Sequence, residues 1–288
     1  MASLIQGESK DLDGFSVNRI LPNKAKKMVG PFIFLDHMGP ASFSAGSGIN
    51  VRPHPHIGLA TLTYLLSGSM LHRDSLGNVQ EIYPGDVNWM TAGRGIVHSE
   101  RETVEVRSQD HALDGLQFWL ALPPDKAEIE PSFQHINKAQ LPHKYCGDTI
   151  IRLIAGEAYA MTSPVRTYAP MFFADVVSKA GSEIPLPVTD SASTETAVYI
   201  QQGEVEIDGI GYNAGDFVLL EGEQTMVAQS QLRLMILGGE RYEQIPYIRW
   251  NFVAYSRERI AQAEQDWKND RFDHIPGDRE EFTPQPGV

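Results

Sequence analysis

Short hydrophobic runs separated by turn-forming residues dominate the first half of the chain. Between residues 30 and 122 these runs recur at about the 8 to 12 residue spacing that is typical of β-sandwiches and barrels. Aromatic and branched side chains, which suit a pleated and half-buried surface, are frequent in them. The pattern predicts strands at residues 59–66 (LATLTYLL), 86–90 (DVNWM) and 116–122 (LQFWLAL).

The same rhythm stops and then resumes in the second half. Residues 123–142 contain four prolines and mixed charges, a composition that interrupts a sheet and suits a connector. Strand-like runs return at Ile150. We therefore expect an N-terminal barrel domain at residues 1–130 and a C-terminal barrel domain at residues 131–288, which also carries the end of the chain.

Two stretches of the first half recur in the second. Tyr64-Leu-Leu-Ser-Gly68 is matched 135 residues later by Tyr199-Ile-Gln-Gln-Gly203, and the stretch from Gly85 is matched 130 residues later at Gly215. A strand that ends in a glycine turn and leads into a hairpin is what a jelly-roll barrel requires, because glycine supplies the positive φ of tight turns. The repeat predicts an all-β fold of two jelly-roll barrels in tandem.

One α-helix is expected after the second barrel. Ser256 can cap its N-terminus, and an acidic residue lies in its first turn. Ile260, Ala263 and Trp267 follow at helical spacing, so the helix has one apolar face that packs against a barrel. The residues after Phe272 are expected to form an irregular surface strap.

The composition narrows the classes of function. The chain has 288 residues, 37 acidic and 24 basic, and its formal charge of −13 disfavours direct binding of nucleic acid. No apolar run approaches a membrane span, and the N-terminal residues lack the pattern of a secretory signal. The single cysteine, Cys146, cannot form an internal disulfide, which agrees with a reducing compartment. We expect a cytoplasmic protein that is monomeric, since two barrels in one chain can cover their own sheet edges.

Histidines at alternating positions indicate the chemistry. His54 and His56 are two residues apart, so both side chains leave the same face of an extended chain. His98 and Glu100 repeat this spacing after two strand signals and a Gly-Asp turn. If the strands pair as in a jelly roll, the four side chains converge on one interior point. Three imidazoles and one carboxylate predict a metal site with positions left open for catalysis, and iron(II), nickel, copper, manganese and zinc all suit these donors.

The second copy of the repeat argues that these four residues are functional. Its local offsets place Thr189, Ser191, Ala228 and Ser230 where the first copy has its three histidines and its glutamate. Residues needed only for the barrel fold should recur in the second barrel. We therefore expect the second barrel to lack metal ligands.

Other polar residues carry weaker signals. His72 and His111 are expected to be hydrogen-bonded turn residues, with a position beside the pocket as the alternative. Gln117 lies between apolar neighbours and either faces the cavity as a substrate contact or satisfies backbone groups. No P-loop, dinucleotide-binding motif or Gly-x-Ser-x-Gly motif is found.

Three long stretches resemble the pirin family of the cupin superfamily, and the resemblance covers nearly the whole chain. They are HPHIGLATLTYLLSGSMLHRDSLG, PGDVNWMTAGRGIVHSE and HALDGLQFWLALP. The resemblance implies a bicupin whose N-terminal barrel binds one metal ion, usually iron, through residues that match His54, His56, His98 and Glu100. The residues from Trp250 onward resemble bacterial members of the family more than animal ones.

The resemblance implies two functions. Several pirins act as quercetin 2,3-dioxygenases, which open a flavonol ring with O2 and release carbon monoxide. Under this hypothesis Glu100 accepts the proton of the 3-hydroxyl group, and the substrate contacts are Trp89, Met90, Gln117 and Phe118. Animal pirins are nuclear co-regulators, and the matching hypothesis is an iron-dependent redox sensor that binds a protein partner. A storage-type or sugar-related cupin with zinc fits the ligands but not the long stretches.

Overall fold

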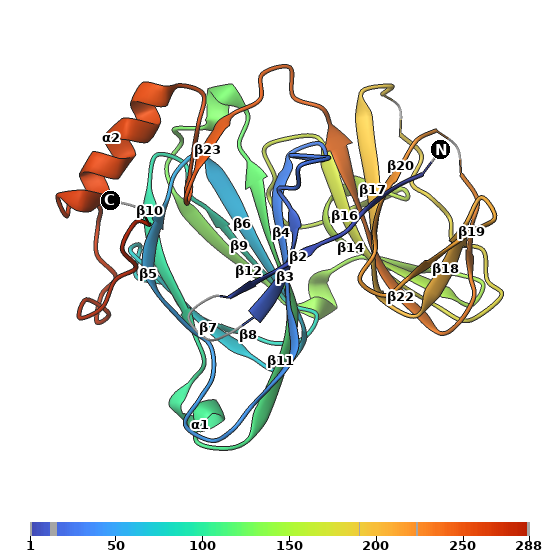
Figure 1. Ribbon diagram of the computed structural model, residues 1–288, viewed down its shortest axis with the longest axis horizontal. Coiled ribbons are helices and arrows are strands. Elements are labelled where there is room, and N and C mark those ends of the chain that lie inside the picture. Colours follow the sequence, from blue (N-terminus) through green and yellow to red (C-terminus); the bar gives the residue numbers. More distant parts are fainter. Residues whose placement is uncertain (1, 12–15, 190, 223, 287–288) are drawn as a thin grey trace. The chain divides into compact units, whose positions relative to one another are not determined.

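A computed structural model describes residues 2–11, 16–189, 191–222 and 224–286 of the chain (Figure 1). Its contacts divide the chain into two compact units. We call them the N-barrel unit (Lys10–Asn18, Asp36–Lys138 and Glu243–Val288) and the C-barrel unit (Met1–Ser9, Arg19–Leu35 and Ala139–Tyr242). The predicted fold, two barrels of β-strands with a short C-terminal helix, is confirmed.

Two sheets carry the strands of the N-barrel unit. One has the order β12-β9-β6-β11-β4-β3-β2 and the other the order β5-β10-β7-β8. The predicted strands at 59–66, 86–90 and 116–122 are confirmed as β6, β9 and β11, which are neighbours in the first sheet. The strands are β2 (Glu8–Asp11), β3 (Ser16–Leu21), β4 (Phe32–Phe43), β5 (Asn50–His56), β6 (Leu59–Ser67), β7 (Met70–Asp74), β8 (Val79–Ile82), β9 (Val87–Thr91), β10 (Ile96–Arg101), β11 (His111–Ala121) and β12 (Ser132–Ile136), with the short helix α1 (Val104–Arg107) before β11. Residues 8–9, 19–21 and 32–35 of the first three strands are assigned to the C-barrel unit.

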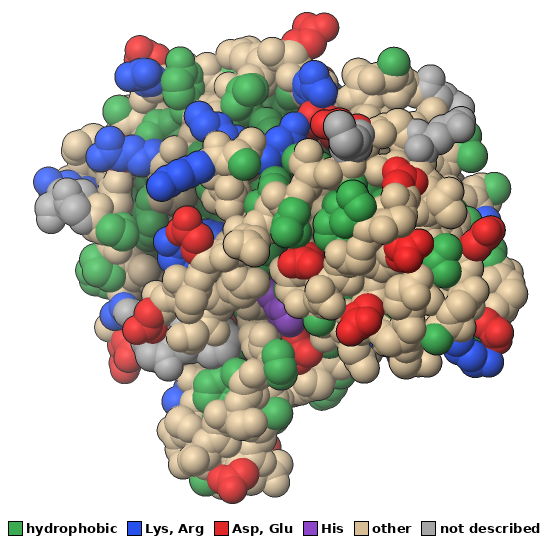
Figure 2. Space-filling view, turned by 45° about the vertical axis from the view of Figure 1, so that its right-hand side comes forward, with side chains coloured by type: hydrophobic (Ala, Val, Ile, Leu, Met, Phe, Trp, Pro, Cys, Tyr) green, Lys and Arg blue, Asp and Glu red, His purple; other side chains and the backbone are tan. Residues whose placement is uncertain are grey.

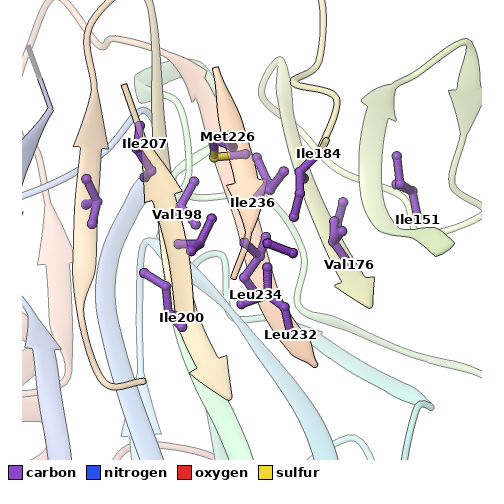
Figure 3. Packing of buried hydrophobic residues seen from close by; sticks show 14 of the residues in the cluster. Ile151, Val176, Ile184, Val198, Ile200, Ile207, Met226, Leu232, Leu234 and Ile236 are labelled. Carbon is purple, nitrogen blue, oxygen red and sulfur yellow. The ribbon is translucent and has the colours of Figure 1, made fainter. Parts of the chain in front are cut away.

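The C-barrel unit has an eight-stranded sheet, in which β15 pairs with β14 beside the order β1-β20-β17-β22-β16-β14-β13, and a three-stranded sheet with the order β19-β18-β21. Aliphatic side chains fill its interior, among them Ile207, Met226 and Ile236 (Figure 3). The strands are β1 (Ser3–Ile5), β13 (His143–Cys146), β14 (Thr149–Ala158), β15 (Met161–Thr162), β16 (Met171–Ser178), β17 (Thr194–Gln202), β18 (Glu204–Ile207), β19 (Ile210–Asn213), β20 (Phe217–Leu220), β21 (Met226–Ala228) and β22 (Leu232–Glu240).

The two copies of the sequence repeat form matching strands. Tyr64 on β6 and Tyr199 on β17 are both fully buried. Each strand is followed by a glycine in the left-handed region, with φ of +79° at Gly68 and +85° at Gly203. A residue with a Cβ atom rarely adopts this conformation, which explains why both copies have glycine there.

The strand register changes one detail of the comparison between the copies. Continuing the offset of 135 residues carries His72 to Ile207. Glu100 pairs with His72 across β10 and β7, and Met226 pairs with Ile207 across β21 and β18. Met226 of the second barrel therefore corresponds to Glu100 of the first. The sequence offset of 130 predicted Ser230 instead, because the second copy has fewer residues between its Gly-Asp turn and this position than the first copy has.

The predicted connector at residues 123–142 contains a strand. Strand β12 has the sequence Ser-Phe-Gln-His-Ile and pairs with β9 along its whole length, so that Phe133 lies opposite Met90. The four prolines of the segment lie outside this run, so they do not prevent its backbone from joining the edge of the sheet. The segment also has two short 3-10 turns, Pro124–Lys126 and Lys138–Gln140.

The C-terminal segment belongs to the N-barrel unit, whereas the predicted division at residue 130 grouped it with the second barrel. Its hairpin consists of β23 (Tyr247–Arg249) and β24 (Phe252–Ala254). The backbone N–H of Val253 donates to the carbonyl of Ile57 at 3.1 Å. This contact places the hairpin beside the end of β5.

The predicted helix is confirmed as α2 (Arg257–Lys268). The hydroxyl of Ser256 accepts a hydrogen bond from the backbone N–H of Arg259 at 3.1 Å, which is the expected N-cap. The helix buries Ile260 and Ala263 in a cluster with Phe252 of β24. Its apolar face therefore packs within the N-barrel unit, as its spacing predicts.

The tail after α2 lies along the outer side of the β5–β10 pair, where Figure 1 draws it in red beside these strands. The backbone N–H of Thr283 donates to the carbonyl of Pro53 at 2.8 Å. Asp278 accepts hydrogen bonds from Ser99 at 2.8 Å and from Arg101 at 3.1 Å. The tail covers β5, which is an edge strand of its sheet. Pro53 and Pro55 have no backbone N–H, so this edge already lacks two hydrogen-bond donors.

The surface agrees with the charge of the sequence. Acidic side chains are scattered over the face shown in Figure 2 and do not gather in one patch. Among the residues that the structure describes, no helix has the length and apolar character needed to cross a membrane.

Candidate metal centre

Three histidines from two paired strands meet inside the N-barrel unit. His54 and His56 extend from β5 and His98 from β10, and their ligand nitrogens all lie within 4.8 Å of one another. The alternation of side chains along β5 puts its two histidines on one face, and the register places His98 directly opposite His54. Each side chain is buried, with an exposed fraction of 6% or less. The predicted gathering of these three residues is observed.

The hydrogen bonds of the histidines leave one nitrogen of each ring for a ligand. Nδ1 of His54 donates to the carbonyl of Arg52 at 2.9 Å, and Nδ1 of His56 donates to the carbonyl of Asn251 at 3.2 Å. Nε2 of His98 is buried and has no hydrogen-bond partner among the described residues. A buried polar atom without a partner is costly, and a metal ion would supply the missing interaction. The residues therefore fit a metal ion.

Burial keeps the three imidazoles in the form that binds metals. It lowers the pKa of His54 to about 4. It also holds the pKa values of His56 and His98 well below 6.5, and repulsion from His54 adds to this shift. All three rings are therefore neutral at pH 7, which leaves a lone pair for coordination.

Glu100 faces the same interior but is held by the opposite sheet. Its Oε1 accepts a hydrogen bond from Gln117 Nε2 at 3.3 Å and lies at the same distance from Thr63 Oγ1, whose one hydrogen is shared with Gln117 Oε1 at 2.8 Å. The group of three histidines does not include its carboxylate. Burial raises the pKa of Glu100, although the nearby His72 and the hydrogen bonds from Thr63 and Gln117 act in the other direction. Its place as a fourth ligand stays a prediction.

The inner face of the seven-stranded sheet forms the wall opposite Glu100. Because Gln117 contacts Glu100, its side chain identifies this face, and side chains directly opposite on neighbouring strands share it. Two rows of residues follow from the register: Gln117, Thr63, Asn88 and His135 in one, and Trp119, Thr61, Met90 and Phe133 in the other. The wall thus offers both polar groups and apolar rings.

This register corrects two of the four predicted substrate contacts. Phe118 follows Gln117 on β11, and Trp89 lies level with Phe118 because both pair with Leu62. Successive side chains of a strand alternate between faces, so both aromatic residues point away from the histidines. Nε1 of Trp89 instead donates to Thr91 at 3.1 Å. The other two predicted contacts, Met90 and Gln117, lie on the inner face.

Comparison with known proteins agrees with this architecture. Family models described as pirin and as the pirin C-terminal cupin domain match residues 14–120 and 173–273. A pirin-like protein from Caulobacter vibrioides is 45% identical over 282 residues, which cover 96% of each chain. The chain belongs to the pirin family. The family predicted from the sequence is thereby confirmed.

Two further relatives of this pirin have names that refer to an activity. A Pseudomonas aeruginosa protein, provisionally named a quercetin 2,3-dioxygenase, is 37% identical over 95% of this chain and 87% of its own length. The crystal structure of a quercetin 2,3-dioxygenase from Acinetobacter baumannii matches with a TM-score of 0.91 and 32% identity, covering 100% of this chain and 95% of that one.

Sequence reasoning missed two contributors to the site of this pirin. Trp119 lies against His56, with ring centroids 5.0 Å apart, and its position two residues after Gln117 is the signal that could have identified it. The carbonyl of Asn251 orients His56, but a backbone group gives no sequence signal. His72 was expected in a turn and lies within β7, hydrogen-bonded to Asp74, while His111 begins β11 and pairs with Glu102.

Proposed function

We propose that this pirin is a metal-dependent dioxygenase that opens flavonols such as quercetin with O2. The observation that carries the proposal is the set of three neutral, buried histidines, one of which has an unpartnered Nε2, facing a wall with aromatic and polar side chains. The names of the Pseudomonas and Acinetobacter relatives support this substrate class.

In this proposal His54, His56, His98 and Glu100 hold one divalent ion, which we take to be iron(II). Three imidazoles with one carboxylate suit iron(II), and also nickel, copper, manganese or zinc. When bound, the ion supplies Lewis-acid and redox chemistry for the reaction of the flavonol with O2. Carbon monoxide is the second product of the ring opening.

The protein side chains would bind the flavonol and move its proton. Trp119, Met90 and Phe133 present apolar surface on the inner wall, against which the flavonol rings can pack. Glu100 would accept the proton of the 3-hydroxyl group at its carboxylate, and its raised pKa makes it a better base. Thr63 and Gln117 hold this carboxylate in place by donating to Oε1.

Oxygen consumption tests the proposal. The protein would be reconstituted anaerobically with iron(II) and then mixed with quercetin and O2, beside the variants His98→Ala and Glu100→Gln. Uptake should require bound iron and fall by about a hundredfold or more in both variants. The control is Asp114→Asn, which alters a buried carboxylate that pairs with His37.

Stoichiometric metal without O2 uptake on any flavonol would contradict the dioxygenase. The alternative function, an iron-dependent redox sensor that binds a protein partner, would then be tested by comparing partner binding in the oxidised and reduced states.

A further inference from the structure

We propose that His72 and Asp74 are positioning residues for metal binding, which hold His98 in the tautomer whose Nε2 faces the metal. The inference deepens the proposed function, because it depends on His98 being a ligand of that site.

Strand β7 places both residues beside the site. Asp74 lies opposite His98, and His72 lies opposite Glu100, in the pairing of β7 with β10. Side chains directly opposite in a sheet share a face, so both point toward the histidines. Nδ1 of His98 lies 3.5 Å from Nδ1 of His72, and Nε2 of His72 lies 3.0 Å from Oδ2 of Asp74.

Asp74, His72 and His98 form a chain of hydrogen bonds, and the acceptors in it determine which nitrogens carry hydrogens. Asp74 is fully buried, and its Oδ1 accepts hydrogen bonds from the backbone N–H groups of Leu76 and Asn78, both at 3.0 Å. The side-chain amide of Asn78 donates to both carboxylate oxygens. A carboxylate surrounded by donors acts as an acceptor, so the hydrogen of His72 lies on Nε2.

The position of that hydrogen fixes His98 in turn. With His72 neutral its ring has one N–H, which lies on Nε2, so its Nδ1 is an acceptor and the facing Nδ1 of His98 carries the hydrogen. Nε2 of His98 is then a bare lone pair, and this is the buried atom that lacks a partner among the described residues. The hydrogen-bond chain from Asp74 through His72 thus assigns the tautomer, and the unpartnered Nε2 is the atom that it leaves free for a metal ion.

Stacking supports the ring of His72 in this position. The ring of Phe133 stacks on His72, with centroids 4.3 Å apart and planes inclined by 12°. His54 and His56 donate to backbone carbonyls, whereas the partner of His98 is a side chain. His98 is therefore the ligand whose orientation can be altered by substitution.

Nuclear magnetic resonance of the metal-free protein tests the tautomer directly. Long-range ¹H–¹⁵N correlation at neutral pH should show the hydrogen of His98 on Nδ1, with an unprotonated Nε2. In Asp74→Asn the amide can donate to Nε2 of His72, so the hydrogen of His72 moves to Nδ1. Each hydrogen bond in the series then runs in the opposite direction, and the hydrogen of His98 moves to Nε2. A wild-type His98 with its hydrogen on Nε2 would overturn the proposal.

Metal affinity gives the second measurement. Competition with a chelator should show a dissociation constant for iron(II) about ten to a hundredfold higher in Asp74→Asn and in His72→Phe. His72→Phe keeps the stacking with Phe133 and serves if Asp74→Asn does not fold. Asp114→Asn, which alters another buried histidine–aspartate pair, should bind metal as the wild type does.

Unchanged affinity in His72→Phe, relative to Asp114→Asn, would also overturn the proposal. Neither measurement uses a flavonol or O2, so the positioning role and the dioxygenase activity can fail independently of each other.

Discussion

The backbone carbonyl of Asn251 accepts a hydrogen bond from Nδ1 of His56 at 3.2 Å, across 195 positions of the sequence. The C-terminal segment therefore helps to orient a residue of the metal site. Its next residue, Phe252, is fully buried and forms a bridge with Ile57, which follows His56. Packing of this segment and orientation of the site are thus coupled.

Replacing Phe252 by Ala should weaken both the fold and metal binding. The ring stacks on Phe272 with centroids 6.1 Å apart, and loss of a buried phenyl ring costs about 3–5 kcal/mol. The carbonyl of Asn251 should shift with it, so the dissociation constant of the metal should rise about tenfold. Urea unfolding and chelator competition measure the two effects.

Ile57→Val is the control for this variant, because it trims the other side of the same contact. It should cost about 0.5–1.5 kcal/mol and leave metal affinity unchanged. A destabilised Phe252→Ala protein with wild-type metal affinity would show that the carbonyl of Asn251 is not needed.

Lowering the pH should destabilise the metal-free protein between pH 6.5 and about 4. Burial lowers the pKa of His54 from 6.5 to about 4, so in this range the unfolded state binds a proton that the folded state does not. The free energy of unfolding should fall by roughly 3 kcal/mol through His54 alone, and His56 and His98 act with the same sign. Urea unfolding at a series of pH values measures the slope. An equally steep slope in His54→Gln would contradict this assignment.

Removing the carboxylate of Asp278 should release the tail from β10. Asp278→Ala loses hydrogen bonds to Ser99 and Arg101, and bonds to charged groups contribute about 1.5–3 kcal/mol. The amide of Thr283, which donates to Pro53, should exchange with solvent about tenfold faster or more. Glu281→Gln alters a half-exposed partner of Arg101 and should change this rate little. Equal rates in the two variants would argue against anchoring by Asp278.

Replacing each of two tryptophans on opposite faces of the sheet should affect substrate binding in one variant and stability in the other. Under the proposed function, Trp119→Leu should raise the KM for quercetin severalfold, since an aromatic contact is worth about 0.5–1.5 kcal/mol, with metal content unchanged. Trp89→Leu should lower the free energy of unfolding without changing the KM, because Trp89 faces away from the histidines. Steady-state kinetics and urea unfolding measure both, and a raised KM in Trp89→Leu alone would contradict the assignment of faces.

The alternation of residues predicts much of the site but not which face is inside. His54 and His56 share a face because a strand has a period of two, and this follows from their spacing alone. In β9, by contrast, all five residues are buried, so polarity does not distinguish its faces. The inner placement of Met90 rather than Trp89 depends on pairing with β6, whose register is set by long-range contacts.

The sequence by itself determined the local elements, the repeat of two barrels and the spacing of the three histidines, because these depend on neighbouring residues and on turn chemistry. Only the tertiary structure decided that Glu100 meets Thr63 and Gln117, that Asp74 and His72 stand behind His98, and that Asn251 orients His56. These contacts join residues from different strands or from opposite ends of the chain. Their partners are selected by strand register and by the packing of the C-terminal segment, which no local pattern encodes.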